Sequence, residues 1–503
     1  MQTRWRLLKN AFANLGRGGA AGFVAVVLPS ILVRHMTPVA YGVWVLVLQA
    51  AAYINYLDFG LQTAIGRYLA YANEKCDIRQ RDSIFSTAFA GLIVAAAVSL
   101  VVLVGATLAV HVLFPNIPGG LISPMRWALL IVGISIAVGL PASAWNGVFV
   151  GLQRNEIPAI ITGFNKLVSA GLIVWAALAG KSLVWMALAV AAPNLSAYLV
   201  QYICIRRVAP ELMFKASHVR RESASELFSY CMSLTVWSFS MLLVIGVDLI
   251  IVGRVEFSAL TPYSVAASLA AFVAGIQYAI FSAMMPHAAV VQARQDPQGL
   301  GNLVLTSTKI SLVLLIVTGA PLIFCAATLI KLWIGQNFVL SGAPILVVLL
   351  FANMIRLIGV PYSVVLVGTG QQRVVMIGPL LEGFTNLFAS LVLGTKMGAI
   401  GVAWGTLVGA VVGMIALVFY SIPKTNSEIQ LGSVRYLLSA ILVPLLYMWP
   451  ILAVMFWSLL QDIPNLLLVS ATIVSIVPSG AFFFRNQIWR RLRRPLVPER
   501  ADF

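Results

Sequence analysis

Apolar runs of about twenty residues or more recur along almost the whole chain. A helix of that length crosses the hydrocarbon core of a bilayer, which is about 30 Å thick. Only 10% of the 503 residues are charged, whereas soluble domains carry about 25%. An outer-membrane barrel would show alternating segments of about ten residues instead. The sequence therefore predicts an all-α polytopic membrane protein.

The runs predict about fourteen transmembrane helices. Their expected spans are 15–34, 41–72, 84–113, 125–150, 158–179, 184–205, 226–252, 262–287, 302–332, 343–367, 375–395, 399–420, 435–459 and 465–484. No small-residue cleavage site follows the first run, although the basic residues Arg4, Arg6 and Lys9 precede it. We therefore interpret this run as a retained helix rather than a signal peptide.

The net charge of +17 has a pattern that indicates the topology. An even number of helices places both termini on one side of the membrane. With cytoplasmic termini, about 24 of the 33 Lys and Arg residues fall in inside loops and ends, as the positive-inside rule requires. No nucleic-acid-binding motif accompanies this charge, so nucleic acid is not an expected partner. The four cysteines are scattered singly and predict neither disulfides nor a metal site.

Two pairs of similar segments indicate an internal duplication. VGLQRNEIPAIITGFNKLVSAG near Val150 resembles VGTGQQRVVMIGPLLEGFTNLFAS near Val367, and TPVAYG at Thr37 resembles TPYSVA at Thr261. The offsets are all about 220 residues, with six helices between equivalents, so the repeats are parallel. We expect an N-lobe at 1–205, a cytoplasmic linker at 206–225 and a C-lobe at 226–421. Residues 422–503 would add two further helices and a basic cytoplasmic tail. Two such lobes favour alternating access with a site between them.

Three motifs in the first seventy residues carry a resemblance to a known family. Thr37-Pro38-x-x-Tyr41-Gly42, Leu57-Asp58-Phe59-Gly60-Leu61 and Arg67-Tyr68-x-Ala70 are similar to the polysaccharide-transport family, and so is VGLQRNE. This family includes flippases of O-antigen and exopolysaccharide units and shares a superfamily with multidrug antiporters and lipid II flippases. The C-terminal half resembles this family mainly in its number of predicted helices.

The resemblance implies a V-shaped bundle of two six-helix lobes in the bacterial inner membrane. It implies movement of an undecaprenyl-diphosphate-linked oligosaccharide from the cytoplasmic to the periplasmic leaflet. A polysaccharide polymerase is then a candidate partner. The last two helices form a groove for the lipid tail in the related lipid II flippases.

Motifs for an enzyme or a nucleotide site are absent from the sequence. It contains no GxxxxGK[ST] phosphate loop, and Gly368-x-Gly370 lacks the strand and helix of a dinucleotide fingerprint. A glycosyltransferase or ligase needs large polar loops to hold its donor substrate and its catalytic base. The longest polar loop of this chain is too short and too poor in acids for that. We therefore expect no enzymatic activity and no cofactor.

Basic residues inside the predicted spans are candidates to bind an anionic substrate. Arg356 lies near the middle of its span, where a charge is costly unless it faces a partner or a cavity. Lys166, Lys309 and Arg67 lie nearer to span ends, so they could equally reach the membrane surface. Arg17 begins the first span, among glycines. Because arginine binds phosphate through two hydrogen bonds, we expect a cationic cavity centred on Arg356.

Three acids within the spans are candidates for binding a coupling proton or Na⁺. They are Asp58, Glu382 and Asp248. Each could instead be the buried partner of one of the cations. Asp248 lies near the expected periplasmic end of its helix, where water could reach it. Pro361 lies five residues after Arg356 and predicts a kink in that helix.

The two leading functions differ in the charge that their cavities require. A lipid-linked oligosaccharide flippase needs a basic cavity, whereas an antiporter for cationic drugs needs an acidic one. The intramembrane cations match or exceed the acids, which favours the flippase. A membrane scaffold of a polysaccharide complex, the third class, would require no buried charge.

Overall fold

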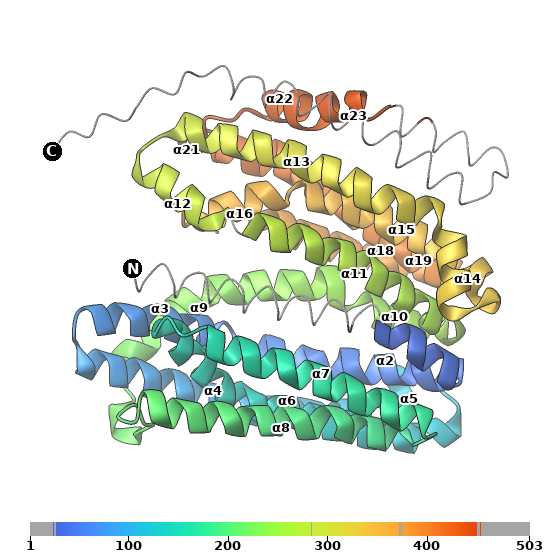
Figure 1. Ribbon diagram of the computed structural model, residues 1–503, viewed down its shortest axis with the longest axis horizontal. Helices are drawn as coiled ribbons and strands as arrows, with labels where there is room; N and C mark the ends of the chain where they lie inside the picture. The colour runs from blue at the N-terminus through green and yellow to red at the C-terminus, as the bar shows by residue number, and fades with distance from the viewer. Residues whose placement is uncertain are drawn as a thin grey trace.

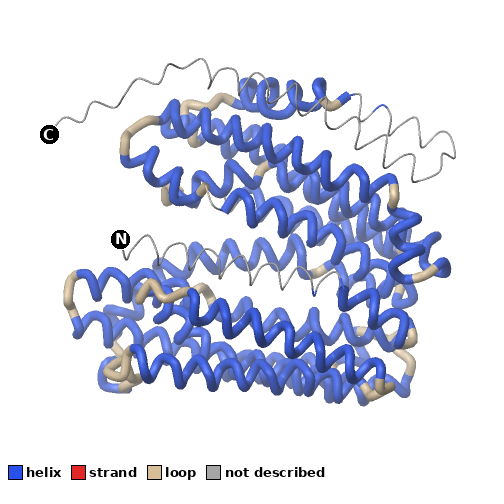
Figure 2. Tube along the Cα trace, in the orientation of Figure 1, coloured by secondary structure: helices blue, strands red, loops and turns tan. Residues whose placement is uncertain are grey.

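Helices make up nearly all of the described chain in the computed structural model (Figures 1 and 2). It describes residues 27–282, 284–371 and 376–449, together with Val24, Val374 and Ala453. No strand occurs in these residues. Arg17, the predicted span 465–484 and the basic tail lie outside them, as do the ends of the first and thirteenth predicted helices.

The first half begins with a helical stretch at 27–35. The elements that follow are α2 Pro38–Ala52, η1 Tyr53–Asp58, α3 Leu61–Glu74, α4 Ile78–Leu108, α5 Val110–Leu113, α6 Gly119–Gly151, α7 Glu156–Leu178, α8 Leu183–Val208 and η2 Ala216–His218.

The second half contains more helices that are broken within a single membrane span. Its elements are α9 Arg221–Met241, η3 Leu242–Gly246, α10 Asp248–Val255, η4 Phe257–Ala259, α11 Leu260–Ser282, α12 Met285–Ala293, α13 Pro297–Phe324, α14 Ala326–Ile334, η5 Gln336–Phe338, α15 Val339–Ile358, α16 Val360–Gly368, α18 Ile377–Met397, α19 Ala399–Ala416, η6 Leu417–Ser421, α20 Ile422–Lys424, α21 Asn426–Ile429, α22 Ser433–Tyr436, η7 Leu437–Leu442 and α23 Val443–Tyr447. Of these, η3, η6 and η7 are π-helical.

Eleven segments of the described chain are long and apolar enough to span a membrane. They coincide with the second to twelfth predicted helices, which are thereby confirmed. The first of them bends where Asp58-Phe59-Gly60 interrupts the apolar run, because Phe59 and Gly60 have left-handed backbones with φ of 50° and 76°. The multi-pass membrane architecture predicted from the sequence is therefore the observed one.

The helices form two groups that diverge toward one end (Figure 1). One contains α2–α8 and the other α11–α19. They meet where α2 packs against α11, and there the Thr261 hydroxyl donates a 2.7 Å hydrogen bond to the Pro38 carbonyl. Thr37-Pro38 and Thr261-Pro262 are equivalent in the expected repeat. Their contact is consistent with a pseudo-twofold axis between the two groups.

The seventh membrane segment, α9–η3–α10, connects the two groups. Its first part, α9, packs against α3 and α4, with Leu227 and Cys231 in their core, and also against α18. Its last part, α10, packs against α18 and α19. The linker before it lies against α4, where the Lys215 and Arg220 amides donate to Ser86 and Thr87. The π-helix η3 therefore lies where the chain passes from one group to the other.

Candidate functional site

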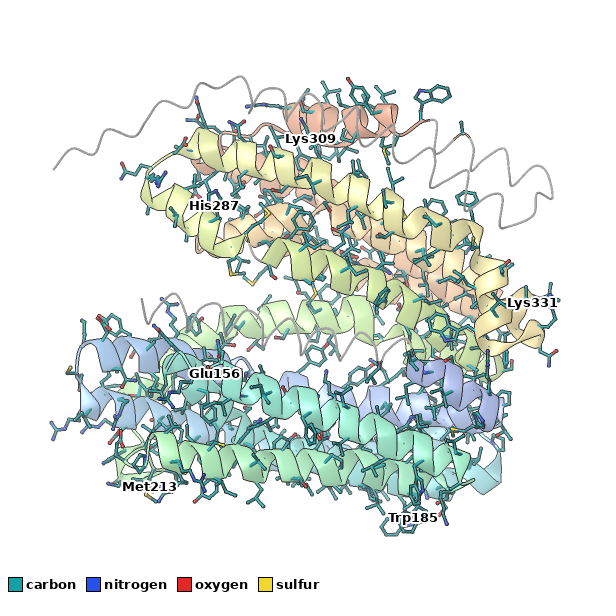
Figure 3. All side chains as sticks on the ribbon, in the orientation of Figure 1. Glu156, Trp185, Met213, His287, Lys309 and Lys331 are labelled. Atoms are coloured by element: carbon teal, nitrogen blue, oxygen red, sulfur yellow. The ribbon has the colours of Figure 1, made fainter. Side chains whose placement is uncertain are left out.

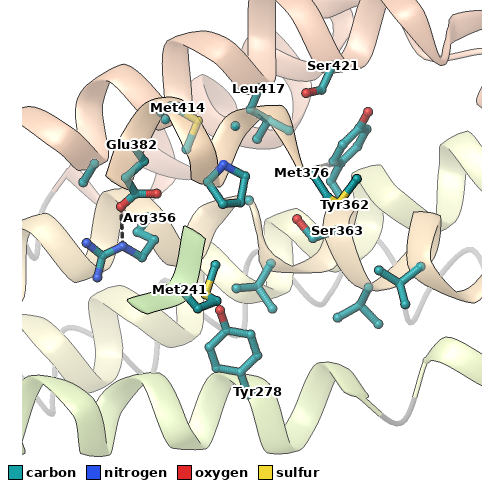
Figure 4. A pocket seen from close by; sticks show the side chains of 18 of the residues that line it. Met241, Tyr278, Arg356, Tyr362, Ser363, Met376, Glu382, Met414, Leu417 and Ser421 are labelled. Atoms are coloured by element: carbon teal, nitrogen blue, oxygen red, sulfur yellow. Dashed lines mark hydrogen bonds and ion pairs between the residues drawn. The ribbon is translucent and has the colours of Figure 1, made fainter. Parts of the chain in front are cut away.

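A cavity of about 370 Å³ opens between α9, α11, α15, α16, α18 and α19 (Figure 4). Most of its lining is apolar and includes the flexible side chains Met241, Met285, Met376 and Met414. Its charged lining residues, among those that the structure describes, are Arg356 and Glu382. We call it the Arg356 pocket. It offers an apolar surface with one charged corner.

Arg356 reaches the pocket because its helix is broken just after it. α15 ends at Ile358, and α16 starts at Val360 with Pro361 in its first turn, as the predicted kink requires. Proline has no amide hydrogen, so the Leu357 carbonyl loses its helical donor. Ser311 Oγ donates to this carbonyl instead, at 3.3 Å, and the Tyr436 hydroxyl donates to the Ile358 carbonyl at 3.4 Å. Side chains of neighbouring helices thus supply the hydrogen bonds that these carbonyls lack at the break.

The Arg356 guanidinium forms an ion pair with Glu382 (Figure 4). The two side chains are 13% and 8% exposed, and Arg356 Nε donates to Glu382 Oε1. Nη1 donates to Asn353 Oδ1 at 3.3 Å. Nη2 is buried and has no hydrogen-bond acceptor in the described part of the chain. A buried donor without an acceptor is costly, so Nη2 is suited to bind an acceptor that enters the pocket.

Glu382 belongs to a column of buried polar residues on α18, with Asn386 and Ser390 one and two turns further on. Three glycines of α19, at 405, 409 and 413, lie against this column, and Gly401 lies against the α18 backbone at Leu393. A Cβ at Gly405 would stand 2.3 Å from Ser390 Oγ, and one at Gly413 would stand 2.8 Å from Glu382 Oε2. Only glycine permits this approach of the two helices.

Asp248 lies beside Asn386 of the same column, at the start of α10, one residue after the π-helix. Its carboxylate accepts hydrogen bonds from Thr406 Oγ1 at 2.9 Å and Asn386 Nδ2 at 3.2 Å. It is 7% exposed, so the expectation that water reaches it is wrong. The sequence suggested a helix end, but the neighbours α18 and α19 cover this position.

The first helix group contacts this region through a backbone carbonyl. Gly246 O, in the π-helix, accepts hydrogen bonds from Gln49 Nε2 at 3.0 Å and from the Tyr53 hydroxyl. A π-helix leaves carbonyls such as this one available to side chains. The Asp248 cluster is therefore attached to both helix groups.

Asp58 lies at the bend between η1 and α3. Its carboxylate accepts a 2.9 Å hydrogen bond from the Gly60 amide and thereby stabilises the left-handed turn. It is partly buried and does not line the Arg356 pocket.

The other predicted cations lie apart from this pocket. Arg67 is exposed on α3, with its guanidinium 4.8 Å from the ring centre of Tyr230. Lys166 is exposed on α7. Lys309 is partly exposed on α13 (Figure 3). Of the described residues expected in one cationic cavity, the structure thus brings only Arg356 to the pocket.

Several residues of this site were not singled out from the sequence. Asn386, Ser390 and Thr406 are uncharged and have no spacing that marks them. The signal that was available is the repeat GxxxGxxxGxxxG at 401–413, which is typical of close helix contacts in membranes. No three His, Cys, Asp or Glu side chains gather as a metal site in the described residues.

Solved transporter structures share the arrangement of the two groups of membrane helices, and the Arg356 pocket is lined by residues of the second half of the chain. An inward-facing multidrug-resistance MATE family transporter of the MOP superfamily matches with TM-score 0.66 and 14% identity, over 84% of this chain and 99% of that one. The lipid II flippase MurJ, in an inward closed conformation, matches with TM-score 0.63 and 13% identity, over 97% and 98%. A MOP superfamily transporter from Pyrococcus furiosus matches with TM-score 0.53 and 13% identity, over 82% and 94%.

The family itself follows from the sequence match. The model of the family described as polysaccharide biosynthesis protein matches residues 7–292, more than half of the chain, so this chain belongs to that family. No curated protein matches the chain. The resemblance drawn from the first seventy residues is therefore confirmed.

Proposed function

We propose that this protein is a flippase for a lipid-linked oligosaccharide, with undecaprenyl diphosphate as the lipid carrier. It would move its substrate from the cytoplasmic to the periplasmic leaflet by alternating access, for O-antigen, capsule or exopolysaccharide synthesis, and would act as a transporter rather than an enzyme. The observation that carries this proposal is Arg356, a buried arginine that keeps an unused donor beside Glu382 in a mainly apolar pocket.

The Arg356 pocket matches the chemistry of such a carrier. A polyprenyl diphosphate combines an apolar chain with two phosphates. The methionine-rich wall can adapt to an irregular apolar chain. A guanidinium binds phosphate oxygens with two parallel hydrogen bonds, so Arg356 would hold the diphosphate at the charged corner. Membership of a polysaccharide biosynthesis family supports a sugar-bearing lipid as the substrate.

Arg356→Ala tests this function. The variant should insert at normal levels but lose export of the lipid-linked oligosaccharide, because the diphosphate loses its counter-charge. Arg356→Lys should keep part of the export, since charge remains without the bidentate geometry. Arg126→Ala is a matched control, because Arg126 lies on α6 outside the pocket and donates to the Leu108 carbonyl.

A purely structural role for the ion pair predicts a different outcome. Arg356→Ala alone would then reduce the amount of folded protein, because Glu382 would be left buried and unpaired. Replacing both partners, with Arg356→Ala and Glu382→Gln, would restore export. Restored export in the double variant would overturn the diphosphate site.

The second candidate function is a cation-coupled multidrug antiporter. The buried acid Asp248, close to the pocket, is the observation that favours it. A flippase should bind a polyprenyl diphosphate and ignore lipophilic cations, whereas an antiporter should do the reverse. Competition between the two ligands on the purified protein separates these functions. The bacterial inner membrane as location and a polysaccharide polymerase as partner belong to the flippase proposal.

A further inference from the structure

The helix that carries Arg356 depends on other helices at its break. Three consecutive backbone carbonyls there, those of residues 356–358, accept hydrogen bonds. The Gly359 amide donates to the Arg356 carbonyl at 3.2 Å, in the tighter pattern of a 3₁₀-helix. Side chains donate to the other two carbonyls, from Ser311 on α13 and from Tyr436 in α22, where the thirteenth predicted helix begins. The backbone around Arg356 is therefore held partly by side chains of other helices.

The first turn of the thirteenth helix contacts a second helix interruption as well. Ser433 Oγ donates to the Val418 carbonyl, which belongs to the π-helix η6. A π-helix leaves carbonyls available to side chains in this way. Ser433 and Tyr436 are three residues apart, so they lie on one face of their helix. That face thus donates to both interrupted segments, and both segments line the Arg356 pocket.

The two interruptions also lie against each other. An added Cβ at Gly359 would stand 3.0 Å from Leu417 Cδ2, at the start of η6. Tyr436 is 0% exposed and belongs to the same core cluster as Leu417 and Tyr362. The break after Arg356, the π-helix η6 and the start of the thirteenth helix therefore form one packed unit beside the pocket.

The Arg356 guanidinium needs an accurate position to bind a phosphate. Two parallel hydrogen bonds to phosphate oxygens require the planar group to face them at the right angle. Glu382 and Asn353 accept from Nε and Nη1, whereas Nη2 has no acceptor in the described residues. These contacts orient the guanidinium, and the backbone decides how far it reaches into the pocket. A misplacement of about 1 Å can cost a positioned group much of its effect.

We propose that Tyr436 and Ser311 are positioning residues for the anionic substrate. Their hydroxyls hold the broken helix so that Arg356 presents Nη2 to the diphosphate. This inference rests on the diphosphate site proposed at Arg356. It gives the start of the thirteenth helix a role in recognising the charged part of the substrate, although neither Tyr436 nor Ser311 lines the pocket.

The test measures ligand binding to the purified full-length protein in lipid nanodiscs, with empty nanodiscs as the blank. Tyr436→Phe removes the hydroxyl and keeps the ring that packs in the core. The affinity for farnesyl diphosphate should fall about fivefold, which corresponds to the contribution of about one hydrogen bond. The affinity for farnesol, which has the apolar chain without phosphates, should stay nearly unchanged.

Tyr41→Phe is the matched control for this substitution. Tyr41 is also a buried tyrosine, 3% exposed, but it lies on α2 outside the pocket. This variant should bind both ligands as the wild type does. Ser311→Ala should behave like Tyr436→Phe, because the Leu357 carbonyl loses its donor. If one of the two positioning variants does not fold, the other decides the question.

A further measurement shows whether the effect passes through Arg356. In an Arg356→Lys background, Tyr436→Phe should change the affinity for farnesyl diphosphate much less. The reason is that a lysine ammonium is a point charge on a flexible stem and has no plane to align. A purely structural role for Tyr436 predicts equal losses in the two backgrounds, because independent effects add.

Three results would overturn this inference. They are wild-type affinity for farnesyl diphosphate in either positioning variant, equal losses of farnesyl diphosphate and farnesol binding, and a loss of the same size in the Arg356→Lys background. In each case the diphosphate site itself would stand. Absence of farnesyl diphosphate binding by the wild type, or full binding by Arg356→Ala, would overturn the proposed function and this inference with it.

Discussion

Asp58 occupies a turn that two successive left-handed residues form. Phe59 and Gly60 have positive φ, and the Asp58 carboxylate accepts the Gly60 amide hydrogen that the turn would otherwise leave unpaired. A Cβ at Gly60 would stand 2.7 Å from Leu234 Cβ, so this turn also fits closely against α9. Asp58 therefore stabilises the bend, and a coupling role is the alternative that the sequence left open.

Two substitutions at Asp58 separate these roles. Asp58→Ala removes the acceptor and should destabilise the protein by about 1–2 kcal/mol, because a buried amide is left without its partner. Asp58→Asn keeps an oxygen acceptor and should keep nearly normal stability. Thermal unfolding in detergent measures both. A changed cation dependence of export in Asp58→Asn would instead favour a coupling role for Asp58.

At the scale of helices, the contact between α18 and α19 positions the candidate site. The glycines of α19 allow the α18 backbone to approach closely, and this places Glu382, Asn386 and Ser390 against α19 rather than against lipid. Burial in this contact leaves Asn386 and Thr406 facing Asp248.

Gly405→Ala should disrupt this contact. Its methyl group would overlap Ser390 Oγ, and overpacking of this kind typically costs about 1–3 kcal/mol. Gly171→Ala, on α7, is the matched control, because nothing lies within 4 Å of its added Cβ. The amount of folded protein and its thermal stability should fall only for Gly405→Ala. Equal behaviour of the two variants would contradict the close packing of α18 and α19.

At the scale of the whole molecule, the two helix groups are joined at one end and apart at the other. The joined end includes the contact of α2 with α11, where an added Cβ at Gly42 would lie 3.6 Å from Thr261 Oγ1. Alternating access requires this end to open during the cycle.

A disulfide between Gly42→Cys and Thr261→Cys should therefore stop export by holding the joined end closed. The test needs a chain in which the four native cysteines are replaced. Export should return after reduction, and each single variant should export normally. Undiminished export in the oxidised double variant would exclude opening at this contact.

The orientation of the chain in the membrane is a further prediction at this scale. The distribution of Lys and Arg places both termini in the cytoplasm and the segment after α5 on the opposite side. Reporter fusions after Phe114 and after Glu499 should therefore report opposite sides. Equal signals from both fusions would contradict this topology.

The sequence by itself determined the membrane spans, because helix formation across a bilayer is a local matter. Every backbone group in the hydrocarbon must be paired within the helix, so the apolar runs predicted α2 to α19 well. The bend at Gly60 and the break before Pro361 were also predicted, since glycine, aspartate and proline act on their own backbone. The position of Arg356 near the middle of a span predicted that its side chain faces either an ion-pair partner or a cavity.

Only the tertiary structure decided which partner each charge has. Glu382 lies 26 residues from Arg356, and Thr406 lies 158 residues from Asp248. Such pairs depend on how helices rotate and cross, which no local pattern specifies. The same reason explains Asp248, which appeared to be at a wet helix end and is covered by α18 and α19. The same reason explains why Lys166, Lys309 and Arg67 lie outside the pocket. A charged side chain near the end of a span can point to a cavity or to the surface, and the packing of the neighbouring helices decides which.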